Sequence, residues 1–192
     1  MGPLIPPLRW CDCEGPSNPS DFGVNERGPS PSLMGARLSE IEYRLIEGLP
    51  DEELLGAIVQ LSNTTFGFDE EVAGYKVALS NRRRLLFCLA FVGPTLTGFK
   101  IGYEERPRYF ESWRGGVLPT ARCKGIGGRL MELQHAWCVE QGFSFITTHC
   151  NNQSIDMLRL NLAHGLLVTG SYLDRGEHLK LLLQKDIRPE GA

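Results

Sequence analysis

The spacing of hydrophobic positions changes several times between residues 41 and 187, and each change predicts a new element. Apolar and polar residues alternate along residues 41–46, which is the period of a strand with one buried face. Leu54, Leu55 and Ile58 then recur at helical spacing behind an acidic first turn. Together these patterns predict the order βααβββαβαββ. The strands are expected over residues 41–46, 85–92, 96–104, 109–117, 143–148, 166–172 and 179–184. The first helix is expected to begin at residue 51, the second to cover residues 69–81, the third to run from a glycine-rich stretch to residue 142, and the fourth to cover residues 155–165.

The three strands between residues 85 and 117 are expected to form an antiparallel meander. Gly93-Pro94 marks the first turn, and both connections are too short for parallel crossovers. The apolar run over residues 85–92 is typical of a buried strand and is too short to span a membrane. The sequence therefore predicts an α/β fold of the α+β kind.

Proline and glycine dominate the first part of the chain. Residues 1–38 hold seven of the 12 prolines and five of the 22 glycines, with no apolar periodicity. We therefore expect an N-terminal extension there, either disordered or packed as extended chain on the domain. The remaining residues, 39–192, have room for one domain and leave little for a second.

The charge of the chain gives no support to nucleic-acid binding, because the formal net charge is −3. Arg82-Arg83-Arg84 is interpreted as a solvated helix end. The N-terminus lacks the charged and then apolar layout of a signal peptide, so a cytoplasmic location is expected.

Six cysteines raise the question of a metal site or of disulfides. Cys11 and Cys13 have the wrong spacing for a zinc knuckle. Four others are scattered singly and are expected to be buried free thiols: Cys88, Cys123, Cys138 and Cys150. Three histidines are isolated and lack ligand spacing: His135, His149 and His164. We therefore expect reduced cysteines and no metal.

Residues 117–128, between a predicted strand and a predicted helix, have the composition of an anion cradle. Glycines there lack Cβ atoms, so successive backbone N–H groups can turn toward one point at the positive end of the helix dipole. Several N–H donors and two cations suit a diphosphate better than a single carboxylate. The glycines are Gly125, Gly127 and Gly128, and the cations are Arg122 and Lys124.

The cradle also carries a signature. Residues 117–127 match Val-x-Pro-x-x-(Arg/Gln)-x-x-Gly-x-(Gly/Ala), which resembles the GNAT superfamily of acyl-CoA-dependent N-acyltransferases. Neither a P-loop nor a Rossmann fingerprint is present. Outside the signature, residues 98–104, 110–117 and 152–161 resemble a subgroup of small bacterial GNAT proteins. A plain strand–turn–helix corner that needs glycines for steric reasons is the alternative.

The resemblance covers about residues 41 to 187 and implies both the fold and the binding of acetyl-CoA. The fold would be a mixed central sheet of about seven strands flanked by helices and splayed between strands four and five. The backbone around Val117 and Leu118 would pair with the pantetheine amides as an added strand. The pyrophosphate would meet the charge of Arg122 and the N–H groups of Lys124, Gly125, Ile126, Gly127, Gly128 and Arg129.

Amine acetylation needs a base, because an alkylammonium group has a pKa of about 10. Glu111 is the leading candidate, since the resemblance to the histone acetyltransferase branch implies a glutamate base at this place, and Glu104 is the reserve. Glu111 lies six positions before Val117, so in an unbulged strand both side chains point to the same face, about 20 Å apart. The alternatives are a solvated strand residue for Glu111 and a hairpin mouth for Glu104.

The proton donor for the CoA thiolate is harder to assign. Many GNAT enzymes have a tyrosine four residues before the glycine that ends the last helix, and this position is Asn161 here. Asn161 can hydrogen-bond the cofactor while solvent protonates the thiolate. Asn152 either binds the cofactor or caps the last helix. Tyr172 is expected to be a core or rim aromatic.

Two functions remain open from the sequence. The first is an acetyl-CoA-dependent N-acetyltransferase that moves the acetyl group to a primary amine of a small molecule or peptide, by direct attack in a ternary complex. The second is a non-catalytic acyl-CoA-binding sensor or scaffold on the same fold. The expected partners are acetyl-CoA and an amine acceptor, without nucleic acid or membrane, and a homodimer is an open option. The acceptor is not readable, because residues 51–81 and variable loops select it.

Overall fold

A computed structural model describes residues 40–189 of the 192-residue chain. The predicted N-terminal extension over residues 1–38, with Cys11 and Cys13, lies outside the described residues. The elements follow the predicted order βααβββαβαββ, with a short 3-10 turn, η1, before the third α-helix. They are β1 (Ile41–Glu47), α1 (Glu52–Phe66), α2 (Val72–Leu79), β2 (Arg83–Val92), β3 (Thr95–Arg106), β4 (Tyr109–Val117), η1 (Pro119–Ala121), α3 (Ile126–Glu140), β5 (Phe145–Asn151), α4 (Ile155–Ala163), β6 (Leu167–Leu173) and β7 (Leu179–Asp186).

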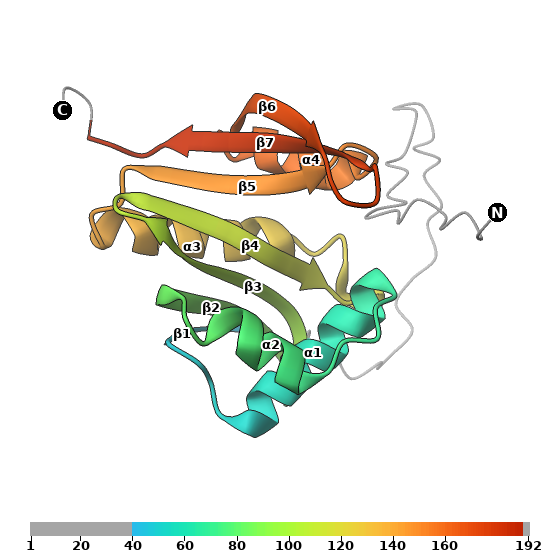
Figure 1. The fold of residues 1–192 in the computed structure, drawn as a ribbon. Coiled ribbons are helices and arrows are strands. Elements are labelled where there is room, and N and C mark those ends of the chain that lie inside the picture. Colours follow the sequence, from blue (N-terminus) through green and yellow to red (C-terminus); the bar gives the residue numbers. More distant parts are fainter. Residues whose placement is uncertain (1–39, 190–192) are drawn as a thin grey trace, which may run out of the picture.

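The seven strands form one sheet in the order β1-β2-β3-β4-β5-β7-β6 (Figure 1). Neighbouring strands pair antiparallel except β4 and β5, which pair parallel. The antiparallel meander of β2, β3 and β4 and the mixed sheet are therefore confirmed. The parallel step needs a long crossover, and α3 supplies it between β4 and β5.

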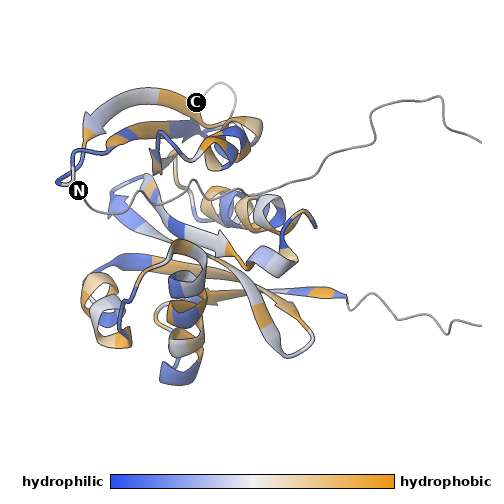
Figure 2. Ribbon diagram, turned by 90° about the vertical axis from the view of Figure 1, so that its right-hand side faces the viewer, coloured by the Kyte–Doolittle hydropathy of each residue, from blue (hydrophilic) through white to orange (hydrophobic). Residues whose placement is uncertain are grey.

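Helices cover both faces of the sheet, with α1 and α2 on one face and α3 on the other (Figure 1). β2 is buried between these layers. Leu85 and Phe87 pack in the core cluster that contains α1 and α2, whereas Leu86 and Cys88 pack in the cluster that contains α3. In Figure 2 the helix ribbons carry both hydrophobic and hydrophilic residues, as expected for helices with one buried face. The apolar run over residues 85–92 is thus a strand buried on both faces.

The ends of α1 follow from its sequence. The Asp51 carboxylate accepts a hydrogen bond from the Leu54 N–H at 2.8 Å and caps the first turn. Gly67 closes the helix at φ 70, in the left-handed region that favours glycine. Within residues 40–189, no helix is both long enough and apolar enough to cross a membrane.

The basic run Arg82-Arg83-Arg84 is exposed, but the prediction of a helix end is wrong. α2 ends at Leu79, and Arg83 and Arg84 are the first residues of β2. Arg83 pairs with Glu104 on β3. Pairing with a distant strand therefore sets this boundary, and a helical period in the local sequence cannot reveal it.

None of the four cysteines within residues 40–189 forms a disulfide. Cys88, Cys138 and Cys150 are buried as predicted, and burial raises the pKa of the Cys88 thiol to about 12. Cys123 is exposed, contrary to the prediction, because it lies in the turn between β4 and α3 with φ 61.

Candidate active site

The strands β4 and β5 pair over three residues and then part. Tyr109, Phe110 and Glu111 pair with Phe145, Ile146 and Thr147, and Glu111–Thr147 is the last pair. Beyond it, residues 112–117 of β4 continue along β3 without β5 on their other side. This is the splay that the resemblance implies. Its edges carry N–H and C=O groups that an extended ligand can satisfy.

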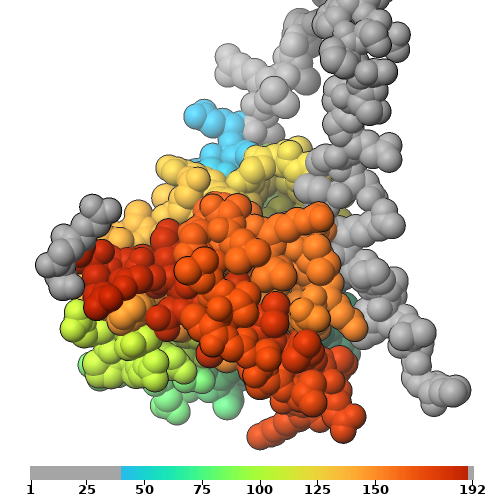
Figure 3. All heavy atoms as spheres, turned by 90° about the horizontal axis from the view of Figure 1, so that it is seen from above, coloured from blue at the N-terminus to red at the C-terminus, as the bar shows by residue number. Residues whose placement is uncertain are grey.

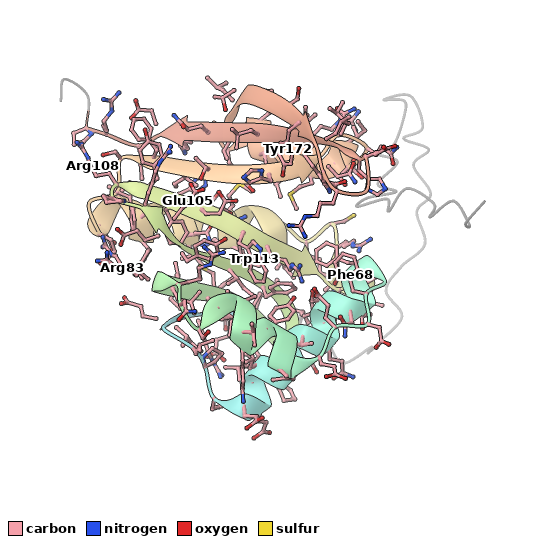
Figure 4. The ribbon with its side chains drawn as sticks, viewed as in Figure 1. Phe68, Arg83, Glu105, Arg108, Trp113 and Tyr172 are labelled. Atoms are coloured by element: carbon pink, nitrogen blue, oxygen red, sulfur yellow. The ribbon has the colours of Figure 1, made fainter. Side chains whose placement is uncertain are left out.

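A cavity of about 380 Å³ lies in the splay, and we call it the splay cavity. Figure 4 shows Phe68 and Trp113 on the side of β4 that faces α1 and α2, and Tyr172 on β6 beyond β5. Seen from above, α4, β6 and β7 in orange and red lie beside α3 in yellow (Figure 3). The cavity is lined by Phe66, Phe68, Lys100, Ser112, Trp113, Arg114, Gly115, Thr148, His149, Cys150, Asn151, Ser154, Asp156, Met157, Asn161 and Lys180.

A second cavity, of about 350 Å³, lies between the anion cradle and α4. Six of the predicted cofactor residues line it: Val117, Arg122, Gly125, Ile126, Gly127 and Gly128. Gly125 has φ 74 and would place a Cβ in open space, so a glycine here serves the backbone conformation rather than packing. Asp156 lines both cavities, which therefore adjoin at the start of α4.

Three other predicted cofactor residues of the cradle do not line either cavity. The expected pairing of the Leu118 backbone with pantetheine cannot use its N–H group, because this N–H already donates to the Thr97 carbonyl at 2.9 Å. Lys124 is exposed on the turn. Arg129 is also exposed and forms an ion pair with Glu132 at 3.0 Å. Unlike these three residues, Arg122 lines the second cavity, and its Nε donates to the carbonyl of Val117 at 3.2 Å.

The two asparagines have different surroundings. Asn161 is 2 % exposed, lies on α4 and lines the splay cavity, and its contact with a cofactor stays a prediction. Asn152 is exposed and lines neither cavity. The capping alternative for Asn152 is wrong, because Ser154 occupies the N-cap position of α4.

Glu111 is buried at the point where β4 and β5 part, with 5 % of its surface exposed. Thr147 Oγ1 donates a hydrogen bond to Glu111 Oε2 at 2.7 Å, and His149 Nε2 lies 3.9 Å from Glu111 Oε1. Burial raises the pKa of Glu111, and this outweighs the Thr147 hydrogen bond and the nearby His149, which act to lower it. The alternative of a solvated strand residue is therefore wrong.

The assumption that β4 is unbulged is wrong. Ile101 and Tyr103 of β3 oppose Arg114 and Glu111 of β4, so two steps on β3 match three on β4. The extra residue reverses the alternation along β4. Val117 packs on the α3 side, whereas Glu111 shares its face with Tyr103, which packs with α1 and α2.

Glu104 and Glu111 are not brought together. Glu104 pairs with Phe110 and therefore lies on the opposite face of the sheet from Glu111. It is partly exposed near the turn that joins β3 to β4, as the hairpin alternative predicts.

His149 and Tyr172 form an arrangement that the sequence alone did not reveal. The Tyr172 hydroxyl and His149 Nδ1 lie 2.9 Å apart in a hydrogen bond, and Tyr172 is 43 % exposed, as expected for a rim aromatic. The polar side chains Thr147, His149 and Tyr172 thus lead from Glu111 to the surface. The available signal was that His149 stands two residues after Thr147, on the same face of a strand.

An aromatic wall with one cation lies on the other side of the splay cavity. The Arg114 guanidinium stacks over Trp113 with its Cζ 4.6 Å from the ring centroid. It also donates to the Tyr75 hydroxyl at 2.8 Å and forms an ion pair with Glu70. No group of three or more histidine, cysteine or acidic residues in the described part of the chain has the geometry to hold a metal.

This architecture is the one that the resemblance to the GNAT acyltransferases implies. A family model described as the Acetyltransferase (GNAT) family matches residues 55–162, which is more than half of the chain. The chain belongs to the GNAT acetyltransferase family. The narrower resemblance to a small bacterial subgroup stays a prediction. No curated protein matches the sequence.

Solved structures of acetyltransferases share the fold at low sequence identity. The ribosomal-protein-S18-alanine N-acetyltransferase from Escherichia coli has a TM-score of 0.66 and 12% identity, covering 79% of this chain and 99% of its own. An IAA acetyltransferase from Bacillus cereus has a TM-score of 0.59 and 18% identity, with 77% and 100% covered. The NatC complex bound to Gag peptide and CoA has a TM-score of 0.66 and 15% identity, with 78% and 99% covered. At these identities the likeness concerns the fold alone.

Proposed function

We propose that this chain is an acetyl-CoA-dependent N-acetyltransferase that acetylates a primary amine of a small molecule or peptide. The observation that carries the proposal is the position of Glu111, a buried carboxyl at the fork between β4 and β5, beside a cavity that adjoins the anion cradle. A buried carboxyl with a raised pKa is suited to accept a proton near neutral pH.

In the proposed reaction, the neutral amine attacks the thioester carbonyl directly in a ternary complex, and the C–S bond breaks. Glu111 takes the amine proton, through water or through His149, which lies between Glu111 and the splay cavity. The cradle N–H groups and Arg122 hold the pyrophosphate, and Asn161 contacts the pantetheine end. Solvent protonates the CoA thiolate, because Asn161 has no proton of suitable acidity.

The competing proposal is a non-catalytic acyl-CoA sensor or scaffold, and the lack of a tyrosine at Asn161 supports it. The burial and hydrogen bonding of Glu111 favour the enzyme. A panel of small amines and peptide N-termini, assayed for CoA release, separates the two. Acceptor-dependent CoA release supports the enzyme, whereas tight acetyl-CoA binding with no release by any acceptor supports the sensor.

Acetyl-CoA is expected to raise the melting temperature of the parent chain, and Gly127→Glu is expected to remove this effect. A ligand that binds only the native state stabilises it by mass action. The new side chain would bring volume and negative charge to the N-terminus of α3, where the diphosphate is proposed to bind. Gly74→Glu, on the exposed side of α2 with open space around its Cβ, is the matched control. If calorimetry detects no acetyl-CoA binding by the parent, the proposed function is wrong.

Arg122→Ala is expected to weaken CoA binding more at low ionic strength than at high. Arg122 is half-buried beside the cradle, and the attraction between a partly exposed charge and a phosphate is screened by salt. Titration calorimetry at two salt concentrations measures the effect, with Arg175→Ala on the β6–β7 turn as the control. Equal affinity of parent and Arg122→Ala at low salt would exclude a role for Arg122 in cofactor binding.

The remaining expectations belong to the same proposal. One acyltransferase domain over residues 39–192, a cytoplasmic location and the lack of nucleic-acid, membrane and metal partners stay predictions, as does the homodimer. Size-exclusion chromatography with light scattering tests the last of these.

A further inference from the structure

Lys100 is a buried lysine in the middle of the sheet. It lies on β3 opposite Gly115 of β4, and only 8 % of its surface is exposed. A Cβ at Gly115 would come within 3.3 Å of Lys100 Cγ, so the glycine gives the lysine stem its path along β4. Beyond this contact the side chain lines the splay cavity, together with Ser112 and Asn161. Lys100 therefore belongs to the wall of the proposed thioester site.

Lys100 differs from the other lysines of residues 40–189 in being buried. Lys76 pairs with Glu52 at 3.0 Å, Lys180 pairs with Asp174 at 3.4 Å, and Lys185 hydrogen-bonds His135 at 3.3 Å. Within residues 40–189, the side chain of Lys100 makes no hydrogen bond or ion pair. A buried ammonium without a partner is costly, so a lysine kept here calls for a functional reason.

The surroundings of Lys100 favour the neutral amine. Burial lowers its pKa to about 8, and the nearby Cys88 of β2, Glu111 of β4 and Cys138 of α3 only partly oppose this effect. His135 of α3 also lies near enough to interact with it. Near pH 8, about half of the molecules therefore hold a free lone pair on Lys100 Nζ.

Resting on the proposed binding of acetyl-CoA in the splay, we propose that Lys100 is itself an acetyl acceptor, so that the chain acetylates its own β3. The lone pair of Nζ attacks the thioester carbonyl carbon, a C–N bond forms and the C–S bond breaks. The sulfur leaves as the CoA thiolate, which takes up the proton lost by the nitrogen, directly or through water. The products are N-ε-acetyllysine and free CoA.

The modification changes the splay cavity in two ways. It removes a titratable amine, and it places an amide with a methyl group in a cavity of about 380 Å³ that the thioester is proposed to share. An amide transfers its acetyl group to an amine far more slowly than a thioester does, so the acetyl group stays on Lys100. Self-acetylation therefore lowers the affinity for acetyl-CoA, and the modified chain is the less active form.

The test uses the purified full chain, acetyl-CoA alone and no added acceptor. Peptide mass spectrometry is expected to find up to one acetyl group per chain, on Lys100, with release of an equal amount of CoA. Below pH 8 the initial rate is expected to rise about tenfold per pH unit and then to level off, following the neutral fraction of the amine. The exposed Lys76 and the paired Lys180 serve as internal controls and are expected to stay unmodified.

Two variants test whether the acetyl group is attached to Lys100 specifically. Lys100→Met keeps an unbranched apolar stem and is expected to lose both the label and the acceptor-independent CoA release. Lys76→Met, on exposed α2, is expected to keep both. Equal labelling of Lys76, Lys180 and Lys100 would show chemical acetylation in solution and overturn the proposal.

Calorimetry separates failure of this inference from failure of the proposed function. If acetyl-CoA binds the parent chain but Lys100 stays unmodified up to pH 9, self-acetylation is excluded and the proposed function stands. If acetyl-CoA does not bind, both proposals are overturned.

Discussion

Glu111→Gln is expected to lower turnover by about 10²- to 10⁴-fold, which is the usual contribution of a general base. The affinity for acetyl-CoA is expected to stay close to that of the parent. The glutamine has nearly the same shape and can still accept the hydrogen bond from Thr147 Oγ1, so the fork between β4 and β5 is retained. What is lost is the ability to take up a proton. Steady-state kinetics with an acceptor from the amine panel, together with calorimetry, measures both quantities.

The pH dependence gives this prediction a second readout. Because burial raises the pKa of Glu111, the parent is expected to lose turnover as the pH falls through that raised value and the carboxyl becomes protonated. The deficit of Glu111→Gln shrinks at high pH, where more of the acceptor amine is already neutral. Glu104→Gln, on the opposite face of the sheet, is the matched control. Parental turnover of Glu111→Gln at all pH values would move the base to Glu104 or to solvent, and loss of acetyl-CoA binding would show that Glu111 is structural.

Lys100→Met is expected to raise the free energy of unfolding at pH 7 by about 3 kcal/mol, since this is the size of a shift in the lysine pKa from 10.5 to about 8. Below pH 8 the lysine is charged in both the folded and unfolded chains, so the whole cost of burying the charge is present. Between about pH 8 and 10.5 only the unfolded chain holds the proton, and the parent gains stability as the pH rises. The advantage of the methionine variant therefore disappears over this range.

Urea unfolding of parent and variant at several pH values between 6 and 10 measures the difference. Lys76→Met is the control, because Lys76 forms a surface ion pair that contributes little and its replacement is expected to change stability by less than about 1 kcal/mol at every pH. A Lys100→Met variant no more stable than the parent at pH 7 would mean that the folded chain solvates the buried ammonium.

The anion cradle was predicted from the local sequence, and only part of the prediction could be made in that way. Its glycines, its cations and its place between a strand and a helix are local features, and six of its predicted residues do line one cavity. The sequence did not reveal that the Leu118 N–H donates to Thr97, a residue 21 positions earlier in the chain, and cofactor binding by Leu118 stays a prediction. A bond between residues so distant in sequence leaves no trace in the local pattern.

The sequence by itself determined the order of the elements, the buried nature of β2 and the cradle signature, because periodicity and turn residues act within a few positions along the chain. Only the tertiary structure decided the chemistry of the site. The bulge that places Glu111 on the face opposite Val117, its contacts with Thr147 and His149, and the burial of Lys100 without a partner all depend on which strands meet and in which register. Strand register is a property of non-local pairing, and a shift of one residue moves a side chain from one face of the sheet to the other.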